Sequence, residues 1–290
     1  MDATPFVSVI IPTYHDWDRL KLCLKALEQQ RYPTDRFEVL VVNNDPEDQP
    51  PYVVSGGNVR LLEEAKPGSY AARNAAIRVA KGEILAFTDS DCIPAKTWLE
   101  EGVRLILGGA ERIAGKIDVF HSSIKPTWVE IYEIHFSLPQ STYAEIGFGA
   151  TANMITRRIC FDKVGLFNAE LLSGGDFEWG MRVQDVGLSV LYAPSVIVEH
   201  PARTRLTELL KKNLRVSSGH YVMNEQSWLS TLRTFISSIA PPFKFICARQ
   251  NIRFCSSLGI KIFLVAWLMR FSAGGFVVLL KIKLLRPTRS

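Results

Sequence analysis

Cysteine is scarce in this sequence and follows no recognisable spacing. The five cysteines among 290 residues are scattered, odd in number and form no CxxC pair. This pattern favours reduced thiols in a cytosolic compartment over a disulfide framework. No basic cluster precedes an apolar run near the first residue, so we expect no secretory signal peptide. Internal repeats and low-complexity stretches are also missing, and 47% apolar with 22% charged residues indicate a globular protein with a core rather than a disordered chain.

Acidic residues are nearly missing from the last part of the chain. Residues 201–290 contain 15 Lys and Arg but only two acidic residues, Glu208 and Glu225, a balance of +13. The first 200 residues carry 27 acidic and 19 basic residues, a balance of −8. An acidic body followed by a basic, aromatic-bearing tail suggests that the tail meets an anionic surface, either membrane lipid or nucleic acid.

Apolar runs and helical spacings alternate along the first hundred residues. We expect strands at 7–11, 37–42, 59–62 and 84–88, with helices from about Leu20 to Leu27, at 70–80 and at 98–107. Two strands joined through a helix nearly always run parallel, with a right-handed crossover. The polar loops after the strands should therefore lie at one edge of the sheet. Open α/β sheets bind ligands at that edge, which predicts a nucleotide site there. Further strands are indicated at 112–120 and 188–198.

Two carboxylates follow the most buried of these strands. Asp89 and Asp91 flank Ser90 directly after Ile84 to Thr88. Paired carboxylates suit a hard divalent ion such as Mg²⁺ or Mn²⁺, which often completes its shell with water and substrate phosphate. The alternative is an ordinary strand-ending turn, since Asp and Ser are common in turns.

Several motifs in order resemble one known family. IIPTYH (Ile10 to His15), VVNND (Val41 to Asp45) and KPGSYAARNAAIRVAKGEILAFTDSD (Lys66 to Asp91), with the segment around Asp176, resemble the inverting family-two glycosyltransferases of the GT-A fold. The resemblance covers about residues 6 to 205. It implies a GT-A catalytic domain over residues 1–203, with a mostly parallel mixed sheet flanked by helices. We expect residues 204–290 to form a basic, helical extension that associates with the membrane.

The resemblance also implies roles for individual residues. Asp91 would bind the metal, Mg²⁺ or Mn²⁺, while Asp89 touches the ribose. The remaining residues expected to bind the nucleotide-sugar donor are Thr13, Tyr14, Asn43, Asn44 and Arg73. The family usually has acidic residues where Asn43 and Asn44 stand in this chain, so the identity of the nucleobase remains open.

Three downstream positions match the family's pattern. Asn153 would face the donor sugar, although the glycines before it are also typical of a plain turn. Asp176 is followed by an Arg six residues later, Arg182, and would be the catalytic base; many relatives have Glu where Gly175 stands. Its alternative is a helix N-cap. His200 would be a further metal ligand or, alternatively, a structural histidine.

The tail carries two kinds of helical signal. Residues 206–215 form a basic amphipathic pattern, and residues 260–280 are strongly apolar but contain Lys261 and Arg270. We favour helices lying at the interface or re-entering it, with the basic end 281–290 facing anionic cytoplasmic lipid. A single tilted span and a soluble helical subdomain are the alternatives.

These patterns favour a metal-dependent inverting glycosyltransferase at the cytoplasmic face of the membrane. It would move a sugar from a nucleotide diphosphate to a glycan or lipid-linked hydroxyl in polysaccharide or cell-envelope glycan biosynthesis, without nucleic acid. One rival is a sugar nucleotidyltransferase, which should show a glycine-rich basic loop where Pro12 to His15 stand. The other is a non-catalytic nucleotide-sugar-binding scaffold, which would not need both Asp91 and Asp176.

Overall fold

The structure, a computed structural model, describes residues 4–223, 227–242 and 257–282 and divides into two compact units. The predicted boundary after residue 203 lies near the junction between His200 and Pro201, but residues 119–137, which we assigned to the catalytic domain, group with the second unit. The first unit comprises Met1–Asp118, Leu138–Leu171 and Gly175–His200, and the second comprises Val119–Ser137, Leu172–Gly174 and Pro201–Ser290.

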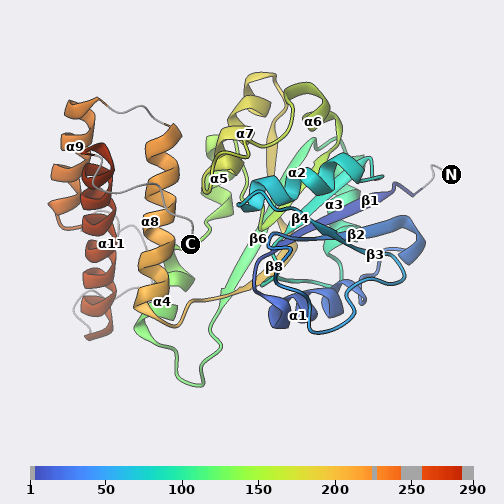
Figure 1. Cartoon of the computed structure of the whole chain (residues 1–290), viewed down its shortest axis with the longest axis horizontal. Coiled ribbons are helices and arrows are strands. Elements are labelled where there is room, and N and C mark those ends of the chain that lie inside the picture. The colour runs from blue at the N-terminus through green and yellow to red at the C-terminus, as the bar shows by residue number, and fades with distance from the viewer. Residues whose placement is uncertain (1–3, 224–226, 243–256, 283–290) are drawn as a thin grey trace. The chain divides into compact units, whose positions relative to one another are not determined.

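An eight-stranded mixed sheet has the order β3-β2-β1-β4-β7-β6-β8-β5 (Figure 1). The first four strands in this order are parallel, β7 runs antiparallel to both β4 and β6, and β5 pairs antiparallel with β8. The bounds are β1 Val7–Thr13, β2 Phe37–Asn43, β3 Val59–Glu63, β4 Ile84–Thr88, β5 Ile93–Pro94, β6 Arg112–Phe120, β7 Asn153–Arg157 and β8 Val190–Pro201.

The central strands form where the sequence has its β-branched and apolar runs. Every residue of β1, β2 and β4 is buried, as expected for strands covered on both faces. The start of β4 also depends on Gly82, because a Cβ there would lie 2.4 Å from the backbone nitrogen of Ser8. The six strands predicted from the sequence are all present, and the predicted mixed, mostly parallel sheet is confirmed.

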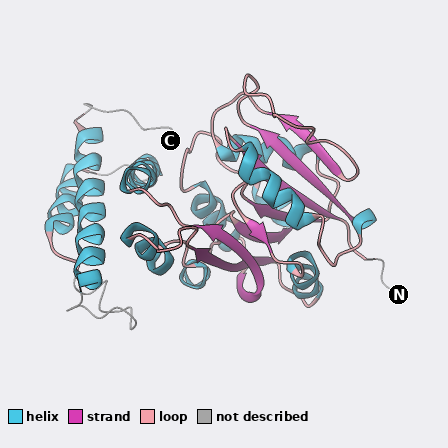
Figure 2. Cartoon of the chain, turned by 90° about the horizontal axis from the view of Figure 1, so that it is seen from below, coloured by secondary structure: helices cyan, strands magenta, loops and turns pink. Residues whose placement is uncertain are grey.

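Helices cover both faces of this sheet (Figures 1 and 2). The crossovers through α1 and α2 run in opposite directions along the sheet, so right-handed connections place these two helices on opposite faces. The helices of the first unit are α1 Trp17–Leu27, the 3-10 turn η1 Thr34–Arg36, α2 Ser69–Val79, α3 Trp98–Leu107, α5 Gln140–Ile146, α6 Ile159–Val164 and α7 Gly175–Asp185.

The second unit is helical. Val129, Leu209, Val265 and Met269 form a buried cluster, against which Trp128 and other partly buried residues pack, so part of the aromatic segment after residue 121 is ordinary core. Its helices are α4 Trp128–Phe136, α8 Leu206–Met223, α9 Trp228–Ile239 and α11 Ser257–Lys281.

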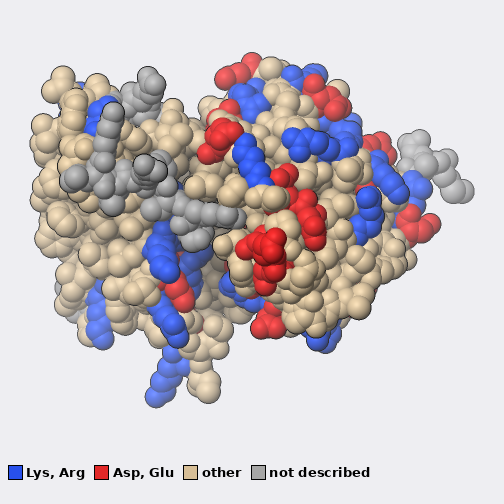
Figure 3. Space-filling view, in the orientation of Figure 1, with Lys and Arg blue, Asp and Glu red and all other residues tan. Residues whose placement is uncertain are grey.

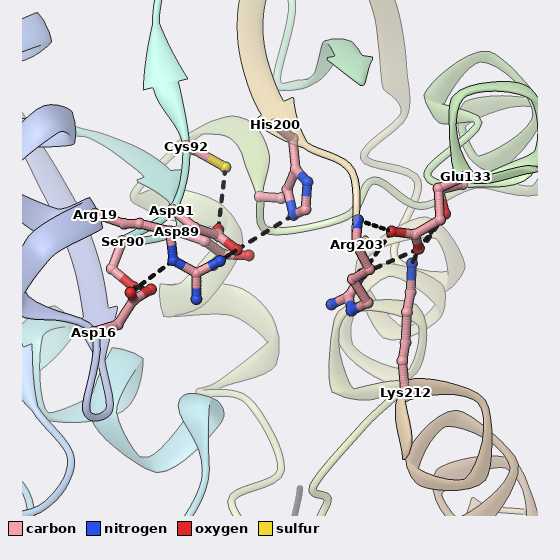
Figure 4. A network of polar contacts seen from close by, with 12 residues as sticks. Asp16, Arg19, Asp89, Ser90, Asp91, Cys92, Glu133, His200, Arg203 and Lys212 are labelled. Carbon is pink, nitrogen blue, oxygen red and sulfur yellow. Dashed lines mark hydrogen bonds and ion pairs between the residues drawn. The ribbon is translucent and has the colours of Figure 1, made fainter. Parts of the chain in front are cut away.

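A buried charge cluster ties α4 to α8 within this unit (Figure 4). The Glu133 side chain is 1% exposed, and its carboxylate accepts hydrogen bonds from Lys212 Nζ at 2.8 Å and from Arg203 Nη1 at 3.1 Å. Burial alone would raise the pKa of Glu133, but Lys212 and Arg203 hold it down at about 2. The ionised carboxylate therefore stabilises the folded unit.

Glu133→Gln should lower the free energy of unfolding by about 3 kcal/mol near neutral pH, because it leaves two cations without their shared counterion. Since the folded-state pKa of Glu133 is lowered, its contribution should be complete above the unfolded value near 4.5 and be lost as the pH falls toward 2. Urea unfolding at several pH values measures this. Glu101→Gln, at an exposed pair with Arg104, is the control and should change little. Equal stability of the two variants would contradict the assignment.

In the antiparallel pair α9 and α11, small polar residues of α9 are buried, and much of the exposed surface is apolar. In α9, Thr231 and Ser238 are buried, and a Cβ on Gly274 of α11 would lie 2.1 Å from Ser238 Oγ. The exposed large apolar side chains of the pair, part of the mostly uncharged surface in Figure 3, are Trp228, Leu229, Leu232, Ile236 and Ile239 on α9 and Ile260, Leu264, Leu268, Phe271 and Leu279 on α11. Each set lies within an arc of about 100° on its helix. Arg233 of α9 and Lys261 and Arg270 of α11 are exposed as well.

Candidate active site

Three parallel strands end side by side at one edge of the sheet. β1 ends at Thr13, β2 at Asn43 and β4 at Thr88, and the pairings of β1 with β2 and β4 give all three the same direction. The convergence predicted from the sequence is confirmed. Polar loops follow each strand, so the edge offers hydrogen-bonding groups where sheets of this kind bind ligands.

The two asparagines after β2 shape the loops around this edge. Asn43 donates from Nδ2 to Asp48 O at 2.9 Å and accepts from Asp45 N at 3.1 Å. Asn44 donates to the carbonyls of Glu64 and Lys66, both at 2.8 Å, and accepts from Gly68 N at the same distance. Both side chains are buried and hydrogen-bonded to these loops, so the structure supports a bracing role for them. Recognition of the nucleobase by these residues stays a prediction.

A histidine that the sequence did not single out lies over the same loop. His15 has a φ of 52°, an uncommon left-handed conformation for a residue other than glycine. Its Nε2 lies 2.9 Å from Asp45 Oδ2 and its Nδ1 3.3 Å from Asp48 Oδ2, while Tyr14 packs its ring against it at 4.2 Å between centroids. Tyr14, 43% exposed, and His15 present polar, aromatic groups to solvent, whereas Thr13 is buried.

Arg73 and Asp89 form an ion pair between α2 and the loop after β4. The Arg73 side chain is 3% exposed and that of Asp89 is 33% exposed, so the cation is buried while the carboxylate reaches the surface. Arg73 also lies over the Tyr70 ring at 5.7 Å. The structure thus brings together two of the residues that the resemblance assigned to the nucleoside, Arg73 and Asp89.

The second carboxylate of the acidic turn has a different set of neighbours (Figure 4). Arg19 of α1 bonds Asp16 Oδ1 at 2.7 Å through Nε and approaches Asp91 Oδ2 at 3.4 Å through Nη1. Ser90 donates to Asp16 Oδ2 at 3.1 Å. Burial raises the pKa of Asp16, and Arg19 opposes that rise. Sequence reasoning missed Asp16 and Arg19, although Asp16 belongs to the loop it had placed at the edge.

Asp91 and His200 offer a donor set that fits a divalent ion. His200 Nε2 lies 3.6 Å from Asp91 Oδ2, and Cys92 Sγ lies 3.9 Å from Asp91 Oδ1. One atom each from Asp91, Cys92 and His200 lie within 4.8 Å of one another. Burial, followed by the nearby Asp91 and Asp89, raises the pKa of the Cys92 thiol. Sulfur is in addition a poor ligand for a hard ion, which prefers oxygen. A carboxylate oxygen and an imidazole nitrogen remain, and these suit Mn²⁺ or Mg²⁺ with water and phosphate.

Asp176 lies in the first turn of α7, with Gly175 as the first residue of that helix. Its Oδ1 accepts hydrogen bonds from Phe177 N at 3.0 Å and from Tyr70 Oη at 3.2 Å. Burial raises the pKa of Asp176, while the Arg73 charge and these hydrogen bonds oppose the rise. A carboxylate with a raised pKa is suited to accept a proton near neutral pH.

Nearby residues of α7 serve the fold. Glu178 and Arg182 form an ion pair at 2.7 Å, and Arg182 also donates to Leu166 O at 2.8 Å. Arg182 therefore anchors α7 to the preceding loop.

Asn153, which the resemblance places facing the donor sugar, begins β7 opposite Thr88, the last residue of β4. It is fully buried, its Oδ1 accepts from Trp98 Nε1 at 2.9 Å, and its Nδ2 donates to Lys116 O at 2.7 Å and Val196 O at 2.9 Å. Both amide hydrogens are used in joining β7 to β6 and β8. The structure supports a bracing role for Asn153, and its contact with the donor sugar stays a prediction. The sequence pattern could not reveal these partners because they come from distant segments.

Comparison with known proteins agrees with this geometry. The family model described as Glycosyl transferase family 2 matches residues 8–165. The glycosyltransferase AglE of Haloferax volcanii is 33% identical over 286 residues, covering 92% of this chain and 93% of the relative. A Methanococcus voltae enzyme named dolichyl N-acetyl-alpha-D-glucosaminyl phosphate 3-beta-D-2,3-diacetamido-2,3-dideoxy-beta-D-glucuronosyltransferase is 21% identical, covering 83% and 79%.

Solved structures show the same fold. The mannosyltransferase PcManGT from Pyrobaculum calidifontis, in complex with GDP-Man and Mn2+, has a TM-score of 0.60 at 18% identity and covers 97% of this chain and 87% of its own. TarS of S. aureus with UDP-GlcNAc has a TM-score of 0.55 at 19% identity, covering 74% and 66%. With its GT-A fold and the family match over more than half of its length, the chain belongs to glycosyl transferase family 2.

Proposed function

We propose that this glycosyltransferase is metal-dependent and inverting, with a nucleotide diphosphate sugar as donor. The observation that carries the proposal is the chain of contacts from Asp176 to the end of β4. Tyr70 bonds Asp176, Arg73 lies over the Tyr70 ring, and Arg73 pairs with Asp89. These contacts, which link Asp176 to the acidic turn, support Asp176 as the base.

The donor would lie along the carboxyl ends of β1, β2 and β4. Tyr14 and His15 would flank the nucleoside, and Asp89, held by Arg73, would contact the ribose. Asp91 and His200 would hold Mg²⁺ or Mn²⁺, which when bound would offset the negative charge on the departing nucleoside diphosphate. The solved relatives with GDP-Man and with UDP-GlcNAc support this class of donor without fixing the base.

The reaction would be a single displacement. Asp176 would accept the proton of an acceptor hydroxyl while the hydroxyl oxygen attacks the anomeric carbon from the face opposite the leaving diphosphate. The bond to the diphosphate oxygen breaks as the new glycosidic bond forms, so the anomeric configuration inverts. The raised pKa of Asp176 matches this role, since a more basic carboxylate is a better proton acceptor.

A panel of UDP-, GDP- and dTDP-sugars tests the donor class directly. We expect one donor to raise the melting temperature of the protein in the presence of Mn²⁺, and to be consumed with release of its nucleoside diphosphate. Absence of both stabilisation and turnover across the panel, with and without Mn²⁺, would argue against the proposed activity.

The second unit supports attachment to a membrane. The close approach of Ser238 of α9 to Gly274 of α11, with a largely apolar exposed surface on both helices, is typical of helices that pack in lipid. Within the described residues, one helix, Gly259–Lys281, is long and apolar enough to cross a bilayer. However, α8 lies along α11, where Asn213 donates to Met269 O at 2.7 Å, and it exposes Lys211. Because a charged helix beside α11 is costly within hydrocarbon, an interfacial position is favoured.

The acceptor would then be a glycan or a lipid-linked molecule at the cytoplasmic face of the membrane. The M. voltae relative is named for a dolichyl phosphate-linked acceptor. The basic composition after residue 200 suits anionic lipid, although most of the basic end at 281–290 lies outside the described residues. These features support a role in polysaccharide or cell-envelope glycan assembly.

Replacing Leu229 and Leu232 of α9 by Glu should reduce binding of the full chain to vesicles containing anionic lipid by at least about tenfold, because each Leu buried in lipid contributes roughly 1.5–3 kcal/mol. Vesicle flotation measures this. The matched control is Leu22→Glu with Leu107→Glu, at two exposed positions of the first unit. Equal flotation of both double variants would contradict lipid binding by α9, and a dimer lost in the α9 variant without vesicles would indicate self-association instead.

A further inference from the structure

The catalytic carboxylate proposed above has a buried tyrosine as its side-chain hydrogen-bond donor. Tyr70, in the first turn of α2, is 5% exposed, and its Oη donates to Asp176 Oδ1 at 3.2 Å. The two residues are 106 positions apart in the sequence. Only the folding of α2 against the start of α7 brings them together.

The residue before Asp176 leaves room for this tyrosine. A Cβ added at Gly175 would lie 2.7 Å from Tyr70 Cε2 and 2.9 Å from Tyr70 Cζ, closer than side-chain carbons pack. Any larger residue at position 175 would therefore push the ring away from Asp176. The observed position of the Tyr70 ring therefore requires glycine at position 175.

The tyrosine ring is also held from its other sides. Its centroid lies 5.6 Å from that of Phe167, and the Arg73 guanidinium lies 5.7 Å from the ring centroid. Arg73 is itself fixed by its ion pair with Asp89. Because these contacts restrict the ring, the hydroxyl keeps one direction, toward Asp176.

We propose that Tyr70 is a positioning residue, whose hydroxyl fixes the Asp176 carboxylate for proton transfer from the acceptor, and that Gly175 is required to admit its ring. This inference rests on the proposed function, in which Asp176 is the base. Tyr70 keeps its own proton, and its hydroxyl fixes the orientation of the carboxylate that meets the acceptor. The proton of the acceptor moves to Asp176 alone.

The groups around Asp176 determine the direction of the expected pH effect. From α2, Tyr70 donates a hydrogen bond and Arg73 supplies positive charge; from α5, Tyr143 lies near. The backbone N–H groups of Thr151 and Phe177 complete the surroundings. Burial, then the Asp176 charge, raises the pKa of Tyr143 to about 12, so Tyr143 is neutral. Removing the Tyr70 hydroxyl removes a bond that favours ionised Asp176, so its pKa should rise.

Tyr70→Phe tests the inference while keeping the ring. We expect kcat to fall about tenfold or more, with KM for the donor within about twofold, because one hydrogen bond to a charged group is lost. The acidic limb of the kcat profile should move to higher pH, since the base works only above its pKa. Tyr32→Phe is the matched control. It removes a buried hydroxyl that lies outside this site and donates a hydrogen bond of 2.5 Å to Pro5 O. That control should lose stability without a change in kcat or pH profile.

Gly175→Ala supplies a second, independent test. It should displace the Tyr70 ring and lower kcat, and adding it to Tyr70→Phe should cost much less than the two separate losses would predict. Fully multiplicative losses would show that Gly175 acts independently of the hydroxyl and would overturn the pairing.

Asp176→Asn measured in the same series separates the possible failures. If Asp176→Asn is inactive but Tyr70→Phe retains the wild-type kcat and pH profile, the positioning role is wrong and the proposed function stands. If Asp176→Asn is itself active, the base assignment fails and the role of Tyr70 fails with it. Loss of kcat in Tyr70→Phe with a shifted acidic limb supports the inference.

Discussion

Asp176→Asn should lower kcat by about a thousandfold and leave donor affinity within about threefold of the wild type. The amide keeps the shape of the side chain and its place at the start of α7, but it cannot accept a proton. Transfer or nucleoside diphosphate release gives kcat, and calorimetric titration gives the donor affinity. A lower kcat with unchanged donor affinity indicates loss of the catalytic base, whereas a weaker donor affinity would indicate damage to the donor site.

Glu178→Gln is the matched control for that substitution. Glu178 lies two residues further along the same helix, where it pairs with Arg182. Its replacement should reduce stability moderately and leave kcat within a few-fold. A near-normal kcat for Asp176→Asn, or an equal loss in both variants, would remove Asp176 as the base.

Asp91→Ala should abolish high-affinity Mn²⁺ binding and lower kcat/KM by about a thousandfold. Asp91 supplies the carboxylate of the donor set, and His200 Nε2, 3.6 Å from its Oδ2, is not sufficient by itself. Electron paramagnetic resonance of Mn²⁺ gives the binding constant without reference to turnover. The same protein can then be assayed for donor turnover across a range of Mn²⁺ concentrations.

Asp118→Ala provides the comparison for a lost surface carboxylate. Asp118 pairs with Lys116 on β6 and is half exposed. It should bind Mn²⁺ and turn over donor like the wild type. Unchanged Mn²⁺ binding in Asp91→Ala would show that the ion, if used, is held elsewhere.

The strand framework could be predicted because its signal is local. β4 begins and ends as predicted, at Ile84 and Thr88, since an entirely apolar run followed by charged residues leaves little ambiguity. The same holds for β1 and β2, whose ends the structure extends by only one or two residues. Right-handed parallel connections then bring the loops to one edge, so the location of the site also followed from the sequence.

The roles of individual amides could not be predicted in this way. Asn44 and Asn153 occupy expected places in the motifs, but their hydrogen bonds go to Gly68 and Trp98, partners far along the chain. Such partners are set by tertiary packing, which a pattern in one segment does not contain. Tyr70 was overlooked for the same reason, because its contact with Asp176 joins two distant helices.

The helical tail shows a related limit. Residues 260–280 predicted an apolar helix, and the structure has one, α11. Sequence spacing did not show that Gly274 and Ser238 would pack together and leave Leu264 and Leu268 exposed. The face that packs depends on the partner helix, so the exposed apolar face became visible only from the folded unit.

The anomeric configuration of the first product tests the central claim most directly. In the absence of acceptor, slow hydrolysis of an α-linked donor by the wild-type protein can be followed by proton NMR before the free sugar equilibrates. A single displacement with Asp176 as base predicts that the β-anomer appears first and that Asp176→Asn releases neither anomer at a comparable rate. Initial release of the α-anomer would show retention and contradict the mechanism.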